Sequence, residues 1–184
     1  MKNDFKGREK FLKELGLFNV EFSRLEFALL DLCSMTSPSF PKSANVIDFI
    51  GKTLKEKRTL LRKYIKSELP ELLEEWEVIN GEIGVLNLER RYLVHGIGRA
   101  YLFHENISTY VKVGKTVQTK EYKVKDIKSL TNRIGHVNTG KNGINGVFYF
   151  KFKTAIIDSY NERVENSEKI VFKLNGEIVS KWKG

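Results

Sequence analysis

The sequence has a single cysteine, Cys33, so the chain can form neither an internal disulfide nor a cysteine-rich zinc site. Cys33 lies in the apolar segment 29–33, where a small buried side chain is a better interpretation than a nucleophile. No run of about 18 apolar residues occurs, so no membrane span is predicted. The first seven residues include no apolar signal core, and we expect a cytoplasmic protein.

Common phosphate-binding and nucleophile motifs are also missing. There is no Gly-x-x-x-x-Gly-Lys-Ser/Thr loop and no Gly-x-Ser-x-Gly elbow, and residues 140–143 indicate a turn. The chain has three histidines, and neither His104 nor His136 has a second ligand at a metal-binding spacing. We therefore predict no metal site and no cofactor.

The chain does have an excess of positive charge. Its 184 residues carry a net charge of +9, with a hydrophobic fraction of 41% and a charged fraction of 30%, values typical of a globular protein. Residues 1–100 hold 17 basic and 15 acidic side chains, whereas residues 101–184 hold 15 and 8. A basic surface favours polyanions such as RNA, and solubility alone is the alternative explanation.

Residues 1–100 show helical periodicity. We predict a first helix over 5–15, which Gly16 ends or bends, and a second helix that prolines 38 and 41 terminate. The apolar face of the second helix is formed by Phe18, Phe22, Leu25, Leu29 and Leu32.

Two further helices are predicted after the prolines. Thr53 and Glu56 have the spacing of a capping box, which predicts a helix to about residue 67. Its basic side chains form either a solvated face or a face that follows phosphates. Pro70 suits the first turn of the next helix, which we expect to end just after His95, at Gly96 and Gly98.

The pattern changes after residue 100. Residues 109–119 predict a β-hairpin, residues 127–137 a helix, and residues 170–182 a second hairpin around an Asn-Gly turn. Residues 144–157 fit two interpretations. Phe148, Phe150 and Phe152 alternate as in a strand, but Ile144, Phe148, Phe152 and Ile156 recur every fourth position as in a helix, and the aromatic content favours the strand.

The predicted fold class is therefore α+β. Residues 1–100 are expected to form mainly an α-helical bundle. Residues 101–184 are expected to form a basic, β-rich extension, with β-hairpins and a helix, packed on that bundle.

The segment 89–96 carries the strongest chemical signal, because it places Arg90 and Arg91 close to His95. Arginine is a permanent planar cation suited to phosphate oxygens, and histidine exchanges a proton near neutral pH. Such residues suit RNA cleavage, in which a base activates the 2′-hydroxyl and an acid protonates the leaving 5′-oxygen. On an ideal α-helix Arg91 shares a face with His95, whereas Arg90 lies roughly 140° away.

Residues 90–95 resemble the Arg-x4-6-His motif of the HEPN superfamily. Gly96 after the histidine, and the Phe-x-x-Leu-Glu sequence that ends at Glu26, are similar to other members, over about residues 15–100. The resemblance implies a helical bundle that dimerises and a metal-independent endoribonuclease of a toxin–antitoxin or phage-defence system. It also implies His95 as the acid/base, Arg90 as the phosphate cation, and RNA as the substrate.

The match is not complete. Arg91 replaces the polar residue, often Asn, that follows the motif arginine, and Ile97 offers no polar group. Arg91 and Glu26 are candidate supporting residues. For Arg90 to reach the substrate of His95, the helix must deform near Gly96, the side chain must swing round, or a second subunit must close the site.

Two other interpretations stay open. In one, His95 caps the helix end and the arginines pair with Glu89 or Glu82, while Glu26 is a solvated or capping side chain. In the other, the chain is a non-catalytic HEPN-like module that binds nucleic acid or a protein. An acidic antitoxin or other protein partner would also explain the basic charge.

Overall fold

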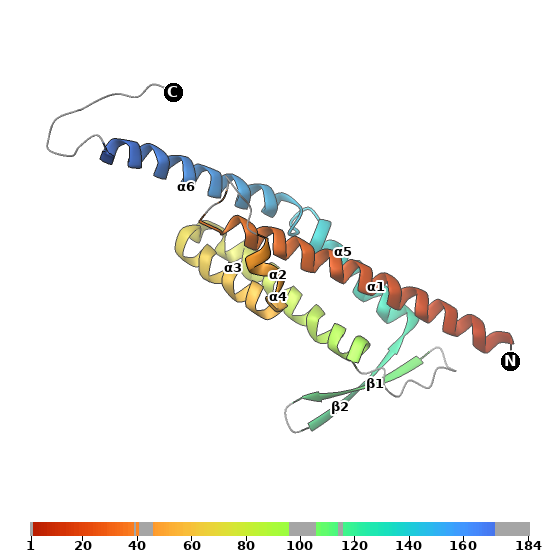
Figure 1. The fold of residues 1–184 in the computed structure, drawn as a ribbon. Helices are drawn as coiled ribbons and strands as arrows, with labels where there is room; N and C mark the ends of the chain where they lie inside the picture. Colours follow the sequence, from red (N-terminus) through yellow and green to blue (C-terminus); the bar gives the residue numbers. More distant parts are fainter. Residues whose placement is uncertain (1, 39, 41–45, 96–105, 114–115, 172–184) are drawn as a thin grey trace.

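A computed structural model describes residues 2–38, 40, 46–95, 106–113 and 116–171. The protein is mostly helical, with one small antiparallel sheet of two strands (Figure 1). In chain order the elements are α1 (Lys2–Met35), α2 (Ile47–Ile50), α3 (Leu54–Glu68), the 3₁₀ turn η1 (Pro70–Leu72), α4 (Leu73–Arg90), the π-helical turn η2 (Arg91–His95), β1 (Asn106–Val113), β2 (Thr116–Lys123), α5 (Val124–Thr139) and α6 (Val147–Val171).

Helix α1 is one continuous helix, so the expected end at Gly16 is wrong. Gly16 is exposed, and a Cβ built there would have no atom within 4 Å. A glycine in a helix costs only about 1 kcal/mol relative to alanine. The buried side chains on both sides of it, including Phe11 and Phe18, anchor the helix in the core and outweigh that cost.

The predicted start of α3 is confirmed. Thr53 is the N-cap, its hydroxyl oxygen accepts from the Glu56 backbone N–H at 3.3 Å, and Glu56 accepts from the Thr53 backbone N–H at 2.7 Å. These bonds satisfy backbone donors that a helix start leaves open. Pro70 begins the turn η1, which leads into α4, as its position predicted.

The hairpin predicted around Gly114 and Lys115 is confirmed, with Val113 paired to Thr116 and Asn106 to Lys123. The structure describes no second hairpin. Ile170 and Val171 belong to α6, so the predicted strand does not begin there, and the rest of 170–182 lies outside the described residues.

The expected strand over 147–157 is wrong, because these residues are helical in α6. The helical pattern was the correct one: Ile144, Phe148, Phe152 and Ile156 are all buried, whereas Phe150 is 68% exposed. The Phe148 ring stacks on Trp76 of α4, with centroids 5.9 Å apart. In an extended strand Phe148, Phe150 and Phe152 would all lie on one side, which the exposure of Phe150 contradicts.

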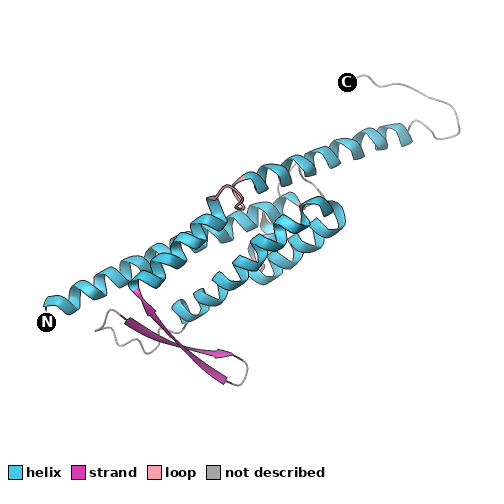
Figure 2. Cartoon of the chain, turned by 180° about the vertical axis from the view of Figure 1, so that it is seen from behind, coloured by secondary structure: helices cyan, strands magenta, loops and turns pink. Residues whose placement is uncertain are grey.

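Among its described residues, the second part of the chain is therefore less β-rich than predicted. Helix α5 lies along α1, as both views show (Figures 1 and 2). One hydrophobic core contains residues of α1, α3 and α4 together with those of α5 and α6. The helices that follow residue 101 are thus packed on the N-terminal bundle as part of the same core.

Cys33 is buried in that core, as its apolar context predicted. Its Sγ donates weakly to the carbonyl oxygen of Lys57, 3.7 Å away. Burial raises the pKa of the Cys33 thiol to about 12, so the thiol stays protonated near neutral pH and has no nucleophilic character. None of the described helices is long and apolar enough to cross a lipid bilayer.

Candidate functional site

The segment that carries the Arg-x4-His motif is not a regular helix end. Helix α4 stops at Arg90, and residues 91–95 form a single widened turn, which we call the π turn. Tyr92 and Leu93 point into the core, whereas Arg91, Val94 and His95 are exposed. Turns of this kind are rare and occur frequently at functional sites.

The π turn changes the angular relation of Arg90 and His95. A π turn closes between residues i and i+5 instead of i and i+4, so each residue rotates the chain by a smaller angle. Residues five apart, such as this pair, thereby move toward a common side. The helix end is thus deformed within residues 91–95. Gly96, where a bend was expected, and Ile97, which was expected to offer the site no polar group, lie outside the described residues.

Arg90 is held by helix α1. Its Nη1 donates to Oε1 of Glu26 at 3.1 Å, and its guanidinium lies 4.7 Å from the centre of the Phe22 ring. The side chains of Arg90 and Glu26 are 34% and 32% exposed. The guanidinium is thus oriented by a carboxylate and a ring and still reaches solvent, which is the orienting role considered for Glu26.

Arg91 and His95 are on the open side of the turn. Within the part of the chain that the structure describes, neither side chain makes a hydrogen bond or ion pair. The alternative pairing of the arginines with Glu82 or Glu89 does not occur for Arg90. Glu82 instead accepts from Arg133 of α5 at 2.7 Å, and Glu89 pairs with Lys120.

Sequence reasoning missed one group of residues beside the motif, the Glu89 cluster: Glu89, Tyr92, Gln118, Lys120 and Tyr122. The Glu89 carboxylate is buried and accepts from the Tyr122 hydroxyl at 2.6 Å and from Lys120. Burial, and then the bond to Glu89, raise the pKa of the Tyr122 phenol. Only the position of Glu89, next to Arg90, could have drawn attention to it.

His136 is exposed on α5, and His104 lies outside the described residues. Among the residues that the structure describes, no group of three or more His, Cys, Asp or Glu side chains could hold a metal ion.

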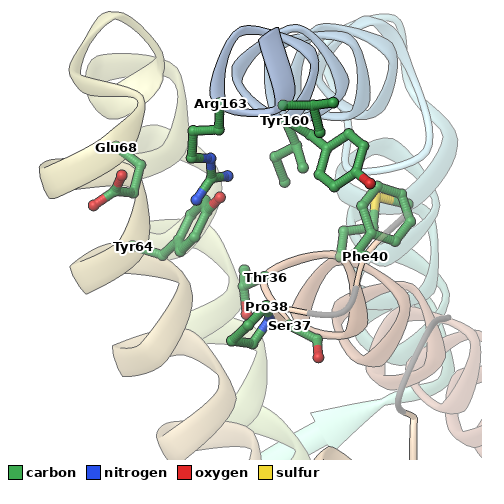
Figure 3. Close-up of a pocket in the computed structure, with 11 residues that line it drawn as sticks. Thr36, Ser37, Pro38, Phe40, Tyr64, Glu68, Tyr160 and Arg163 are labelled. Carbon is green, nitrogen blue, oxygen red and sulfur yellow. The ribbon is translucent and has the colours of Figure 1, made fainter. Parts of the chain in front are cut away.

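A separate cavity of about 510 Å³ lies where the C-terminal end of α1 meets α3 and α6 (Figure 3). Tyr64, Tyr160 and Arg163 project into it, and the Nε of Arg163 donates to the Ser159 carbonyl oxygen at 3.2 Å. None of the motif residues lines this cavity, so it is distinct from the Arg90–His95 segment.

No protein-family model matches the chain, and no match was found among curated proteins or among solved structures. The functional argument therefore depends on the motif and its geometry.

Proposed function

We propose that the protein is a metal-independent endoribonuclease of HEPN type that acts as a homodimer. His95 is the acid/base and Arg90 the phosphate cation, with Arg91 and Glu26 in support. His95 takes the proton of a 2′-hydroxyl, the 2′-oxygen attacks phosphorus, and the bond to the 5′-oxygen breaks as that oxygen takes a proton from the protonated His95. The products are a 2′,3′-cyclic phosphate and a 5′-hydroxyl.

The observation that carries this proposal is the π turn. It occurs at the motif, and a turn of this width brings residues five apart, such as Arg90 and His95, closer to a common side than an α-helix does. Glu26 and Phe22 orient the guanidinium of Arg90 before any ligand binds. Preorganised cations stabilise a crowded phosphate better than groups that must reorganise.

An exposed apolar face of α4 supports the homodimer. Val78 is 73% exposed, Val85 45% and Leu88 42%, and Gly81 is exposed with open space around it. At about 100° per residue these four positions fall within roughly an 80° arc, so they form one stripe, the α4 face. The stripe leads into the π turn. Two copies joined along it would place two motifs beside one shared cleft.

The charge around the motif supports RNA as the substrate. Arg91 and Lys120 reach solvent at the π turn and at the hairpin beside it. Lys123, Lys125 and Lys128 continue the exposed positive charge from β2 into α5. Cations arranged in this way bind the RNA backbone without regard to sequence. A toxin or phage-defence role is the context that the family resemblance implies, and an antitoxin is a candidate partner.

The direct test is incubation of purified protein with RNA in EDTA. We expect cleavage that EDTA does not reduce, with 2′,3′-cyclic phosphate at the new ends, read by treatment with a phosphatase that removes monoesters but not cyclic phosphates. A preparation that binds RNA without cutting it would instead support the non-catalytic binding module.

The two arginines have separable roles. Arg90→Ala should lower kcat/KM by about 10²–10³-fold, because it removes an oriented cation from the transition state. Arg91→Ala should lower kcat/KM by less than about tenfold, mainly because weaker phosphate binding raises KM. Steady-state cleavage of a short fluorescent RNA measures both. Equal losses in the two variants would contradict the assignment of Arg90.

A further inference from the structure

The buried carboxylate of Glu89 is next to the motif but faces the hairpin. Its side chain is 11% exposed at the last turn of α4, one residue before Arg90. Two donors from β2 reach it, the hydroxyl of Tyr122 at 2.6 Å and the ammonium of Lys120. A buried carboxylate is costly without such partners, so these contacts define where the hairpin sits on the helix.

The hairpin also contacts the π turn itself. The hydroxyl of Tyr92 donates to Oε1 of Gln118, and the Lys120 ammonium lies 5.8 Å from the centre of the Tyr92 ring. Gln118, Lys120 and Tyr122 are alternate residues of β2, so one face of the strand supplies these three side-chain hydrogen bonds. On β1 the residue opposite Lys120 is Thr109, which is buried on the same face.

The π turn therefore has supports on two sides. Helix α1 holds Arg90 through Glu26, and the hairpin holds Glu89 and Tyr92 through β2. A π turn is an uncommon conformation, and local conformations of this kind persist when their surroundings over-determine them. Without the hairpin contacts, residues 91–95 would relax toward an α-helix, in which Arg90 and His95 are roughly 140° apart.

We propose that Glu89 is a positioning residue, which seats the β1–β2 hairpin on the π turn through Lys120 and Tyr122 and so keeps His95 on the side of Arg90. This inference rests on the proposed RNA cleavage for its consequence in kcat. Its structural part, the dependence of the π turn on the hairpin, stands apart from that reaction.

Three conservative substitutions test it: Glu89→Gln, Tyr122→Phe and Tyr92→Phe. Each removes one charge or one hydroxyl and keeps the shape of the side chain. We expect kcat to fall by about tenfold to 100-fold, because His95 is displaced from its productive position. KM should stay within about threefold, because none of the exposed cations that bind phosphate is replaced. Should Glu89→Gln fail to fold, the two tyrosine variants carry the test.

Glu82→Gln is the matched control. It lies on the same helix and loses an ion pair to Arg133, and among the described residues it makes no hydrogen bond or ion pair to the hairpin. We expect kcat of this variant to stay within about twofold of wild type, since exposed ion pairs contribute little to stability. A fall in kcat equal to that of Glu89→Gln would show a general effect of weakening α4 and would overturn the proposal.

Amide hydrogen exchange gives a readout that does not need activity. Exchange at residues 91–95 should become at least about tenfold faster in the three variants and not in Glu82→Gln, because the turn opens locally. If wild type cleaves RNA, faster exchange together with lower kcat supports the proposal, and either change alone overturns it. If wild type cleaves no RNA, the proposed function fails, and the exchange rates alone decide whether Glu89 holds the turn.

Discussion

His95→Ala should abolish most RNA cleavage while leaving the fold intact. General acid–base catalysis contributes about 10²–10⁴-fold, and we expect a loss near 10³-fold, which corresponds to about 4 kcal/mol of transition-state stabilisation. Because His95 is exposed and makes no hydrogen bond to another described residue, its removal should change the free energy of unfolding by less than about 0.5 kcal/mol. Single-turnover cleavage in EDTA and thermal unfolding measure the two quantities.

His136→Ala is the control for this prediction. His136 is also exposed, lies on α5 and is remote from the motif in sequence. It should cleave RNA at the wild-type rate. RNA binding by His95→Ala, measured by fluorescence anisotropy at fixed salt, should remain within about threefold of wild type, because the arginines and lysines still contact phosphate. Cleavage by His95→Ala at the wild-type rate would remove the basis of the proposed function.

Val85→Glu should convert the protein into a monomer and abolish cleavage. Val85 lies in the middle of the α4 face, so in the proposed dimer a glutamate there would bury a charge against its own symmetry copy. We expect cleavage to fall by more than about 100-fold at micromolar protein, since each cleft then lacks half of its groups. The residue is 45% exposed in the single chain, so the monomer should remain folded. Light scattering after size exclusion gives the mass.

Val117→Glu is the matched control, because Val117 is 67% exposed but belongs to β2. It should leave both mass and cleavage rate unchanged. A wild-type protein that is monomeric at the concentrations where it cleaves RNA would contradict the shared cleft. So would a monomeric Val85→Glu that cleaves as fast as wild type.

Local patterns predicted several elements correctly. The capping box at Thr53 and Glu56 satisfies backbone donors within one turn, so its signal does not depend on the rest of the chain. The hairpin over residues 109–119 was predicted from its β-branched residues, and β1 and β2 pair there as antiparallel strands. The helix over 127–137 was visible because its apolar residues share one face.

Where the sequence fitted both a helix and a strand, packing against a distant part of the chain determined which one formed. Residues 148–152 fit both a strand and a helix, and the contact of Phe148 with Trp76, 72 residues earlier in the chain, favours the helix. Gly16 has a local tendency to end a helix, but the core contacts of α1 on both sides exceed that tendency. Sequence periodicity contains no information about which distant side chain will cover a given face.

For the candidate site, the sequence by itself determined the motif residues, Arg90, Arg91 and His95, and their angular problem on an ideal helix. Only the tertiary structure decided the conformation of that helix end. The π turn, the pairing of Arg90 with Glu26 and the burial of Glu89 under the hairpin all depend on residues far apart in the chain. A widened turn is less favourable than an α-helix when considered alone, so it exists here because α1 and the hairpin support it from two sides.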